Sequence, residues 1–228
     1  MATSDRQMLV KALLRRIEGS RGKLPGEREL ALALGASRPS LREALGVLEA
    51  LRLIERRPQS GIYVSRAVAD ASIEALVLCE LLDMRPPAAT YEQAQEARVI
   101  HEVEAVRLAT ARRTATDIAT MRALLDTARA NYAAGHNLAD DDEAFHLALV
   151  ASAGNPILLR LTKSLYLMTR SVRQAYFAMA GNAAPSLAEH DRLLASVEKR
   201  NAARAVALMK QHYAGSSARW RRAAREAA

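Results

Sequence analysis

Apolar residues recur at helical spacing along most of the chain, and three such segments come first. Residues 6–18, "RQMLVKALLRRIE", place their leucines on one face, as in an amphipathic helix. A short helix, "ERELALALG", follows a Gly/Pro break, and a third begins at "SRPSLREALGVLEAL". Ser37 suits the N-cap of this third helix, and Pro39 is tolerated because first-turn amides have no helical partner. Two short β-type runs around the turn "PQSG" then predict a hairpin.

The pattern after residue 71 is helical to the end, without strand-like alternation. Proline and glycine gather in short connections, which favours a compact bundle whose sites are built from inward-pointing side chains. The predicted helices lie near residues 72–83, 91–112, 117–133, 141–152, 156–178, 187–199 and 202–213.

These segments divide the chain into an N-terminal unit, residues 1–66, and a helical unit, residues 72–215, joined by a linker at residues 67–71. Residues 216–228 form a basic tail. We expect this tail to fray, because chain ends are poorly ordered unless something ties them down.

Charge is concentrated at the start of the chain. Of the net charge of +8, residues 1–66 contribute +6, from 13 Lys and Arg against 7 Asp and Glu. A basic unit on a nearly neutral body suggests a module that binds a polyanion.

Composition narrows the class of protein further. No apolar run approaches the length of a membrane span, and the N-terminus interleaves charges where a signal peptide would be apolar. The single cysteine, Cys79, allows no internal disulfide and no cysteine zinc cluster. We therefore expect a soluble, cytoplasmic protein without a membrane partner.

Three helices and a hairpin within about 60 residues predict a winged helix-turn-helix, whose recognition helix enters the DNA major groove. Arg38 and Arg42 lie four apart on the face opposite the leucines, with Ser37 and Ser40 beside them. Arginine can take guanine O6 and N7 or grip a phosphate, and Arg28 would lie near the DNA backbone. The alternative is that these arginines form only a solvated face. The expected fold is mainly α: this N-terminal domain and a C-terminal all-α antiparallel helical bundle.

The string "LPGERELALALGASRPSLREALGVLEALRLIERRPQSGIYV" resembles the DNA-binding domain of the GntR transcription regulators. The resemblance implies a homodimer on a palindromic double-stranded DNA operator, with Arg28, Arg38, Ser40 and Arg42 at the DNA and the wing, including Gly61, near the minor groove. Two features depart from the family pattern. Gly26 stands where serine usually caps the helix, and "PQSG" replaces a wing with an arginine between glycines.

Three of the five histidines lie in separate predicted helices beside apolar residues: His146, His190 and His212. In "DDDEAFHLALV", helical spacing places Asp142 and Glu143 on the face of His146. One histidine against a core is usually a packing residue. Three histidines with a carboxylate at helical spacing are harder to explain by packing alone.

The C-terminal unit is similar to the FCD ligand-binding domain of one GntR branch, through "DEAFH", "SAGNP", "EH" and a final histidine. The resemblance implies that Asp142, His146, His190 and His212 bind one divalent metal, Zn in the first place, with Ni, Fe or Mn as alternatives. Glu143 is the weaker carboxylate candidate. Four such ligands leave octahedral positions free for the oxygens of an effector.

The same resemblance places an effector-binding arginine on the long helix, which here is Arg98 in "RVIHE". Its guanidinium could clamp the carboxylate of a small organic or sugar acid. The alternative is an ion pair with Glu102, four residues on. His101 stands where the pattern has leucine or isoleucine.

The sequence therefore predicts a ligand-responsive transcription regulator, a repressor by its expected family, and not an enzyme. A metalloenzyme is the competing class, but "HEVEA" lacks the second histidine of H-E-x-x-H. A constitutive DNA-binding protein with a purely structural metal is the third option.

Overall fold

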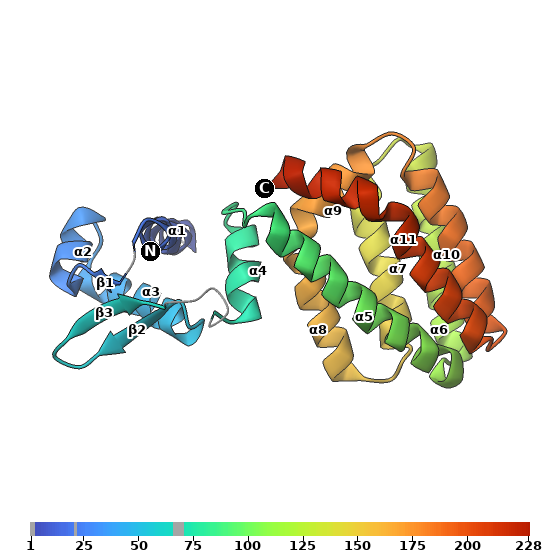
Figure 1. Ribbon diagram of the computed structural model, residues 1–228, viewed down its shortest axis with the longest axis horizontal. Helices are drawn as coiled ribbons and strands as arrows, with labels where there is room; N and C mark the ends of the chain where they lie inside the picture. Colours follow the sequence, from blue (N-terminus) through green and yellow to red (C-terminus); the bar gives the residue numbers. More distant parts are fainter. Residues whose placement is uncertain (1–2, 21, 66–70) are drawn as a thin grey trace. The chain divides into compact units, whose positions relative to one another are not determined.

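The computed structural model describes residues 3–20, 22–65 and 71–228 of the chain. They form two compact units that divide between Met84 and Arg85. Figure 1 labels the elements of both. No helix in these described stretches has the length and apolar character needed to cross a membrane.

The first unit is a winged helix-turn-helix, as predicted. Its elements are α1 (Thr3–Glu18), β1 (Lys23–Leu24), α2 (Glu27–Ala33), α3 (Arg38–Ala50), β2 (Ile54–Arg57), β3 (Gly61–Val64) and α4 (Ile73–Leu81). The sheet order is β1-β3-β2, with antiparallel neighbours and Arg57 opposite Gly61 at the wing turn. β1 was not predicted, because two residues are too short for an alternating pattern.

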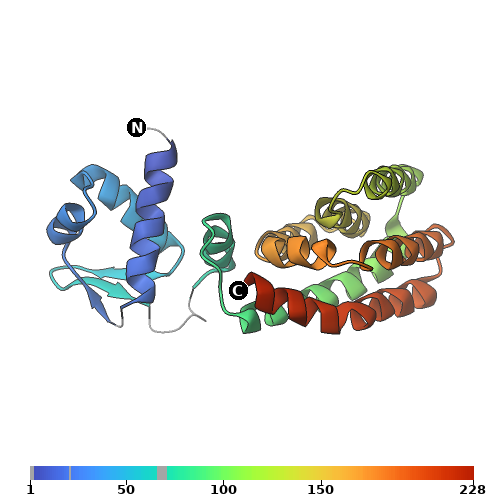
Figure 2. The ribbon, with the colours of Figure 1, turned by 90° about the horizontal axis from the view of Figure 1, so that it is seen from above.

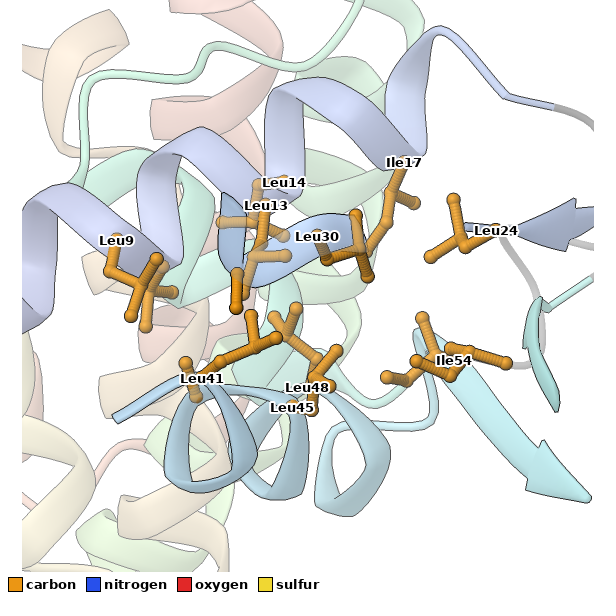
Figure 3. Close-up of a cluster of buried hydrophobic side chains, with 14 of the residues drawn as sticks. Leu9, Leu13, Leu14, Ile17, Leu24, Leu30, Leu41, Leu45, Leu48 and Ile54 are labelled. Carbon is orange, nitrogen blue, oxygen red and sulfur yellow. The ribbon is translucent and has the colours of Figure 1, made fainter. Parts of the chain in front are cut away.

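Figure 3 shows the core of this unit, where leucines of α1 and α3 face Leu30 of α2 and Ile54 of β2. Leu41, Leu45 and Leu48 are fully buried. α3 begins as predicted: the Ser37 hydroxyl accepts the backbone N–H of Ser40 at 3.2 Å. This cap fixes the start of the helix that carries the predicted DNA-binding arginines.

α4 belongs to the first unit, although we assigned residues 72–83 to the C-terminal one. Met84 is buried in the core of the first unit, and Leu78, Cys79 and Leu82 pack against that core. The division therefore falls after α4 and not near residue 66. Most of the predicted linker, residues 67–70, lies outside the described residues.

The second unit is the predicted helical bundle. It contains α5 (Ala88–Arg112), α6 (Ala115–Ala133), α7 (Ala139–Ala151), α8 (Pro156–Leu167), α9 (Arg170–Ala178), α10 (Ala183–Glu198) and α11 (Ala202–Ala227). α5 and α11 pack side by side, as both ribbon views show (Figures 1 and 2).

The helix predicted over 156–178 is in fact two helices. Thr169 leaves helical geometry between α8 and α9, and its hydroxyl donates to the Leu165 carbonyl at 2.8 Å. Neither proline nor glycine marks this break, so no signal in the sequence predicted it.

The expectation that residues 216–228 fray was wrong, because α11 continues to Ala227. Its last turns bury four residues three or four apart, Trp220, Ala223, Ala224 and Ala227, against Tyr91, Val172 and Tyr176. The arginines of this segment lie on the other side of the helix. Their charges made the segment look polar in the sequence, so the apolar stripe was not predicted. At the end of the stripe, Arg85 Nη1 donates to the Ala227 carbonyl at 3.1 Å.

We expect Trp220→Ala to lower the free energy of unfolding by about 3–5 kcal/mol, because it leaves a cavity where a large ring was buried. Urea unfolding followed by circular dichroism measures the loss. Arg222→Ala is the matched control on the same helix, since its exposed ion pair with Glu226 is worth at most about 1 kcal/mol. Equal stabilities of the two variants would contradict a packed C-terminal segment.

Candidate metal centre and DNA-binding face

Four predicted metal ligands meet inside the second unit. α7 carries Asp142 and His146 one turn apart, α10 carries His190 and α11 carries His212, and one ligand atom from each lies within 4.8 Å of the others. The Asp142 Oδ1 atom is 3.7 Å from His146 Nε2 and 3.6 Å from His190 Nε2. Glu143 points elsewhere and pairs with Arg173.

Two further carboxylates orient the imidazoles. The Glu102 carboxylate of α5 is hydrogen-bonded to His146 Nδ1, and Glu189 Oε2 is 2.6 Å from His212 Nδ1. Histidines that bind metals usually donate their second ring N–H to such a carboxylate, which turns the other nitrogen toward the ion. We missed both roles in the sequence. Glu102 was considered only as a partner of Arg98, and Glu189 only as part of the "EH" motif.

The donor set fits a divalent metal. Two ligand atoms that each lie about 2.1 Å from one ion are at most about 4.2 Å apart. The four ligand atoms lie within 4.8 Å of one another, so they need to move only slightly closer together to bind one ion. Burial, and then His146 and His212, lower the pKa of His190 well below its usual value, which favours the neutral imidazole that a metal requires. Three imidazoles and one carboxylate suit Zn, Ni, Fe or Mn.

Arg98 lies beside this cluster and is 2% exposed. Its Nη2 donates to the Tyr166 hydroxyl at 2.7 Å and the Tyr213 hydroxyl at 3.2 Å, and its Nε is 3.4 Å from Glu102 Oε1. Among the described residues, Arg98 Nη1 is buried and has no hydrogen-bond partner. The ion pair with Glu102 is thus present, and one guanidinium nitrogen is still unused.

The space around the cluster is small. The cavity that touches it, lined in part by Asp142, Ser186 and His190, holds about 10 Å³, which is room for roughly one water molecule. This cavity is too small to hold a carboxylic acid.

Glu102 contacts both Arg98 and His146, so it links the buried arginine to the cluster of predicted metal ligands. Burial alone would raise its pKa, but His146 and Arg98 beside it hold the pKa at about 2. The carboxylate is therefore ionised inside the bundle and compensates a buried guanidinium. His101 does not join the cluster, and His136 is exposed in the loop between α6 and α7.

The predicted DNA-binding residues lie at the start of α2, at the start of α3 and at the wing. Arg28, Arg38 and Arg42 are exposed. Arg42 Nε donates to Glu27 Oε2 at 2.7 Å, and the hydroxyls of Ser37 and Ser40 are 2.8 Å apart. Gly61 opens β3 with a φ of +128°, a conformation that favours glycine.

Two family models match the chain: bacterial regulatory proteins of the gntR family over residues 6–64, and the FCD domain over residues 93–215. The chain belongs to the GntR family, in the branch with an FCD domain. The fold and the regulator class predicted from the sequence are thereby confirmed, and the metalloenzyme alternative falls away.

Curated relatives of this GntR regulator are regulators too. The Uxu operon regulator of Haemophilus influenzae is 28% identical over 90% of this chain and 76% of its own. The galactonate operon transcriptional repressor of Escherichia coli is 26% identical over 78% of each chain. Among solved structures, Lar, which controls the expression of the Listeria monocytogenes agr system, has a TM-score of 0.68 at 19% identity over 95% of this chain and 96% of its own. At this identity the likeness supports the fold alone.

We expect Glu102→Gln to destabilise the protein at neutral pH by about 3 kcal/mol or more, because it leaves the Arg98 guanidinium buried without a counter-charge. The folded-state pKa of Glu102 is depressed, so its contribution is complete above the unfolded pKa and is lost as pH falls toward about 2. The stability difference between the wild type and the variant should therefore shrink below about pH 5.

Chemical unfolding at a series of pH values measures this difference. Glu104→Gln is the control on the same helix, where an exposed ion pair with Arg107 is broken instead. A difference that does not change with pH would show that Glu102 is not ionised in the folded state.

Proposed function

We propose that this regulator is a repressor whose FCD domain binds one divalent metal and a small carboxylic acid, and that the acid alters operator binding. The observation that carries the proposal is the convergence of Asp142, His146, His190 and His212 next to a buried arginine with an unused nitrogen. A buried, unpaired guanidinium nitrogen is rare and calls for a partner.

Asp142, His146, His190 and His212 would hold the metal, which when bound offers open coordination positions to the oxygens of an acid. Glu102 and Glu189 keep the tautomers of His146 and His212 that direct Nε2 toward the ion. Zn is the first expectation, and Ni, Fe and Mn suit the same donors.

Arg98 would bind the carboxylate of the acid through Nη1, while Nη2 stays with the Tyr166 and Tyr213 hydroxyls. A relative that regulates a galactonate operon favours a sugar acid among the possible ligands. The acid must displace side chains to enter, and binding that depends on such movement is what couples a ligand to conformation.

The bundle contains a physical link from Arg98 to the first residue of its unit. The Arg98 guanidinium lies 5.5 Å from the Trp220 ring centroid, and the buried stripe that begins at Trp220 ends at Ala227, whose carbonyl binds Arg85. A shift of Arg98 on binding an acid would therefore change the packing of the last turns of α11, which contact Arg85. We expect binding of the effector to change the position of this C-terminal part of α11.

At the DNA, Arg38 and Arg42 would enter the major groove, with Ser37, Ser40 and Arg28 on the backbone and the wing at Gly61 close to the minor groove. The exposed arginines at the start of α3 support this arrangement. A palindromic operator follows if the protein is a homodimer.

The effector site can be tested by thermal unfolding of the zinc-loaded protein with lactate, gluconate and galactonate. An acid at about 100 times its dissociation constant stabilises the folded state by roughly 2.7 kcal/mol. We expect one of these acids to raise the midpoint. Arg98→Lys should abolish that rise but keep the rise caused by zinc, because lysine retains the charge facing Glu102 and loses the planar fork.

Two controls separate the metal from the acid. His190→Ala should lose the response to zinc as well as the response to the acid, and His136→Ala, in an exposed loop, should keep both. If zinc stabilises the protein and no acid adds to it, the domain holds a structural metal and the effector proposal is wrong.

Homodimerisation can be tested on α8, where Ile157 and Leu161 lie one turn apart and are 60% and 42% exposed. We propose this apolar pair as part of the contact between the two subunits. We expect the wild type to sediment as a dimer and Ile157→Glu as a folded monomer, because the new charge would be buried in the interface.

Tyr132→Glu on α6 is the matched control, since Tyr132 is also an exposed apolar side chain, at 47%. A dimer that persists in the Ile157→Glu variant would place the interface elsewhere.

A further inference from the structure

The outer face of the wing sheet gathers two cations around one aromatic ring. Tyr63 of β3 is paired with Lys23 of β1 and Glu55 of β2, and the alternation along β3 turns Ile62 into the core and Tyr63 away from it. The guanidinium carbon of Arg57 lies 4.4 Å from the Tyr63 ring centroid, and Lys23 Nζ lies 6.0 Å from it. The ring thus holds both cations on the exposed side of the sheet.

Gly61 allows Lys23 to lie across the start of the wing. A Cβ at this position would stand 2.7 Å from Lys23 Cε, closer than two carbon atoms approach. The lysine stem therefore occupies the space that a side chain at residue 61 would fill. The absence of a side chain at Gly61 brings a cation from β1 to the base of the wing turn.

A hollow of about 670 Å³ lies beside this turn, and its lining includes Lys23, Arg57, Ser60 and Glu27. Glu27 is occupied by Arg42 of the recognition helix, and Arg57 has an exposed ion pair with Glu55 at 2.8 Å. Within the described ranges, Lys23 forms no ion pair. A cation that is positioned but not paired can take an external anion without first giving up a partner.

We propose that Lys23, together with Arg57, binds a phosphate of the DNA backbone in this hollow. Lys23 brings its cation to the wing turn from the neighbouring strand β1. Through Glu27 the hollow adjoins Arg42, so the phosphate belongs to the duplex whose major groove α3 enters. A phosphate contact positions the protein on DNA without reading its sequence.

The test is the salt dependence of DNA binding, measured by fluorescence anisotropy on two duplexes of about three helical turns. One duplex is selected from a random pool by the wild-type protein, and the other is its scrambled sequence. Each lost phosphate contact lowers the slope of log affinity against log salt by about 0.9. We expect Lys23→Ala to weaken binding to both duplexes and to lower both slopes, by about 0.9 for each subunit on the DNA.

In Lys23→Ala, the ratio of the affinities for the selected and the scrambled duplex should equal that of the wild type. Lys23→Arg should restore the wild-type slope of log affinity against log salt. Lys199→Ala, an exposed lysine of the second unit, is the control and should change nothing. Arg57→Ala should lower the slope as well. Arg38→Ala tests the proposed base contacts separately, because it should reduce the ratio of affinities.

Two results would overturn the proposal. An unchanged slope in Lys23→Ala, with an unaltered circular dichroism spectrum, would make Lys23 a solvated side chain. A collapse of the affinity ratio in Lys23→Ala would make it a reader of bases instead of a phosphate contact. Neither result depends on whether the FCD domain binds a metal or an acid.

Discussion

The chain of buried charges from Arg98 through Glu102 to His146 is the interaction on which the second unit depends. Arg98 and Glu102 lie one turn apart on α5, and His146 reaches Glu102 from α7. The charges of Arg98 and Glu102 are buried, so each is tolerated because the other compensates it, and the His146 imidazole is hydrogen-bonded to the same carboxylate. α5 and α7 are thereby held in one register, and that register brings Asp142 and His146 toward His190 and His212.

The same buried residues would make the proposed centre responsive to a ligand. The proposed acid would take the free nitrogen of Arg98, whose other nitrogens are engaged with Glu102, Tyr166 and Tyr213. Because these partners lie on α5, α8 and α11, a shift of Arg98 on binding would affect all three helices. The tightness of the cavity beside Asp142 and His190 is consistent with such a mechanism.

Local chemistry predicted the parts of this molecule that depend on neighbouring residues. The cap at Ser37 and the helical spacing of Asp142 and His146 are properties of single helices. Whether α7, α10 and α11 meet at one point depends on tertiary packing, which periodicity does not contain, so the resemblance to FCD domains supplied it. The break at Thr169 had no proline or glycine to mark it. The stripe at Ala223, Ala224 and Ala227 escaped notice because alanine adds little hydrophobic signal among arginines.

The membership of α4 in the first unit matters for hybrid regulators, in which the DNA-binding half of one protein is fused to the sensing half of another. A fusion point near residue 66 would remove Cys79, Leu82 and Met84 from the core that they complete. A fusion point at Arg85 keeps that core whole and leaves the α11 end with the arginine that binds it. In this regulator, the boundary at which specificities can be exchanged therefore lies after α4.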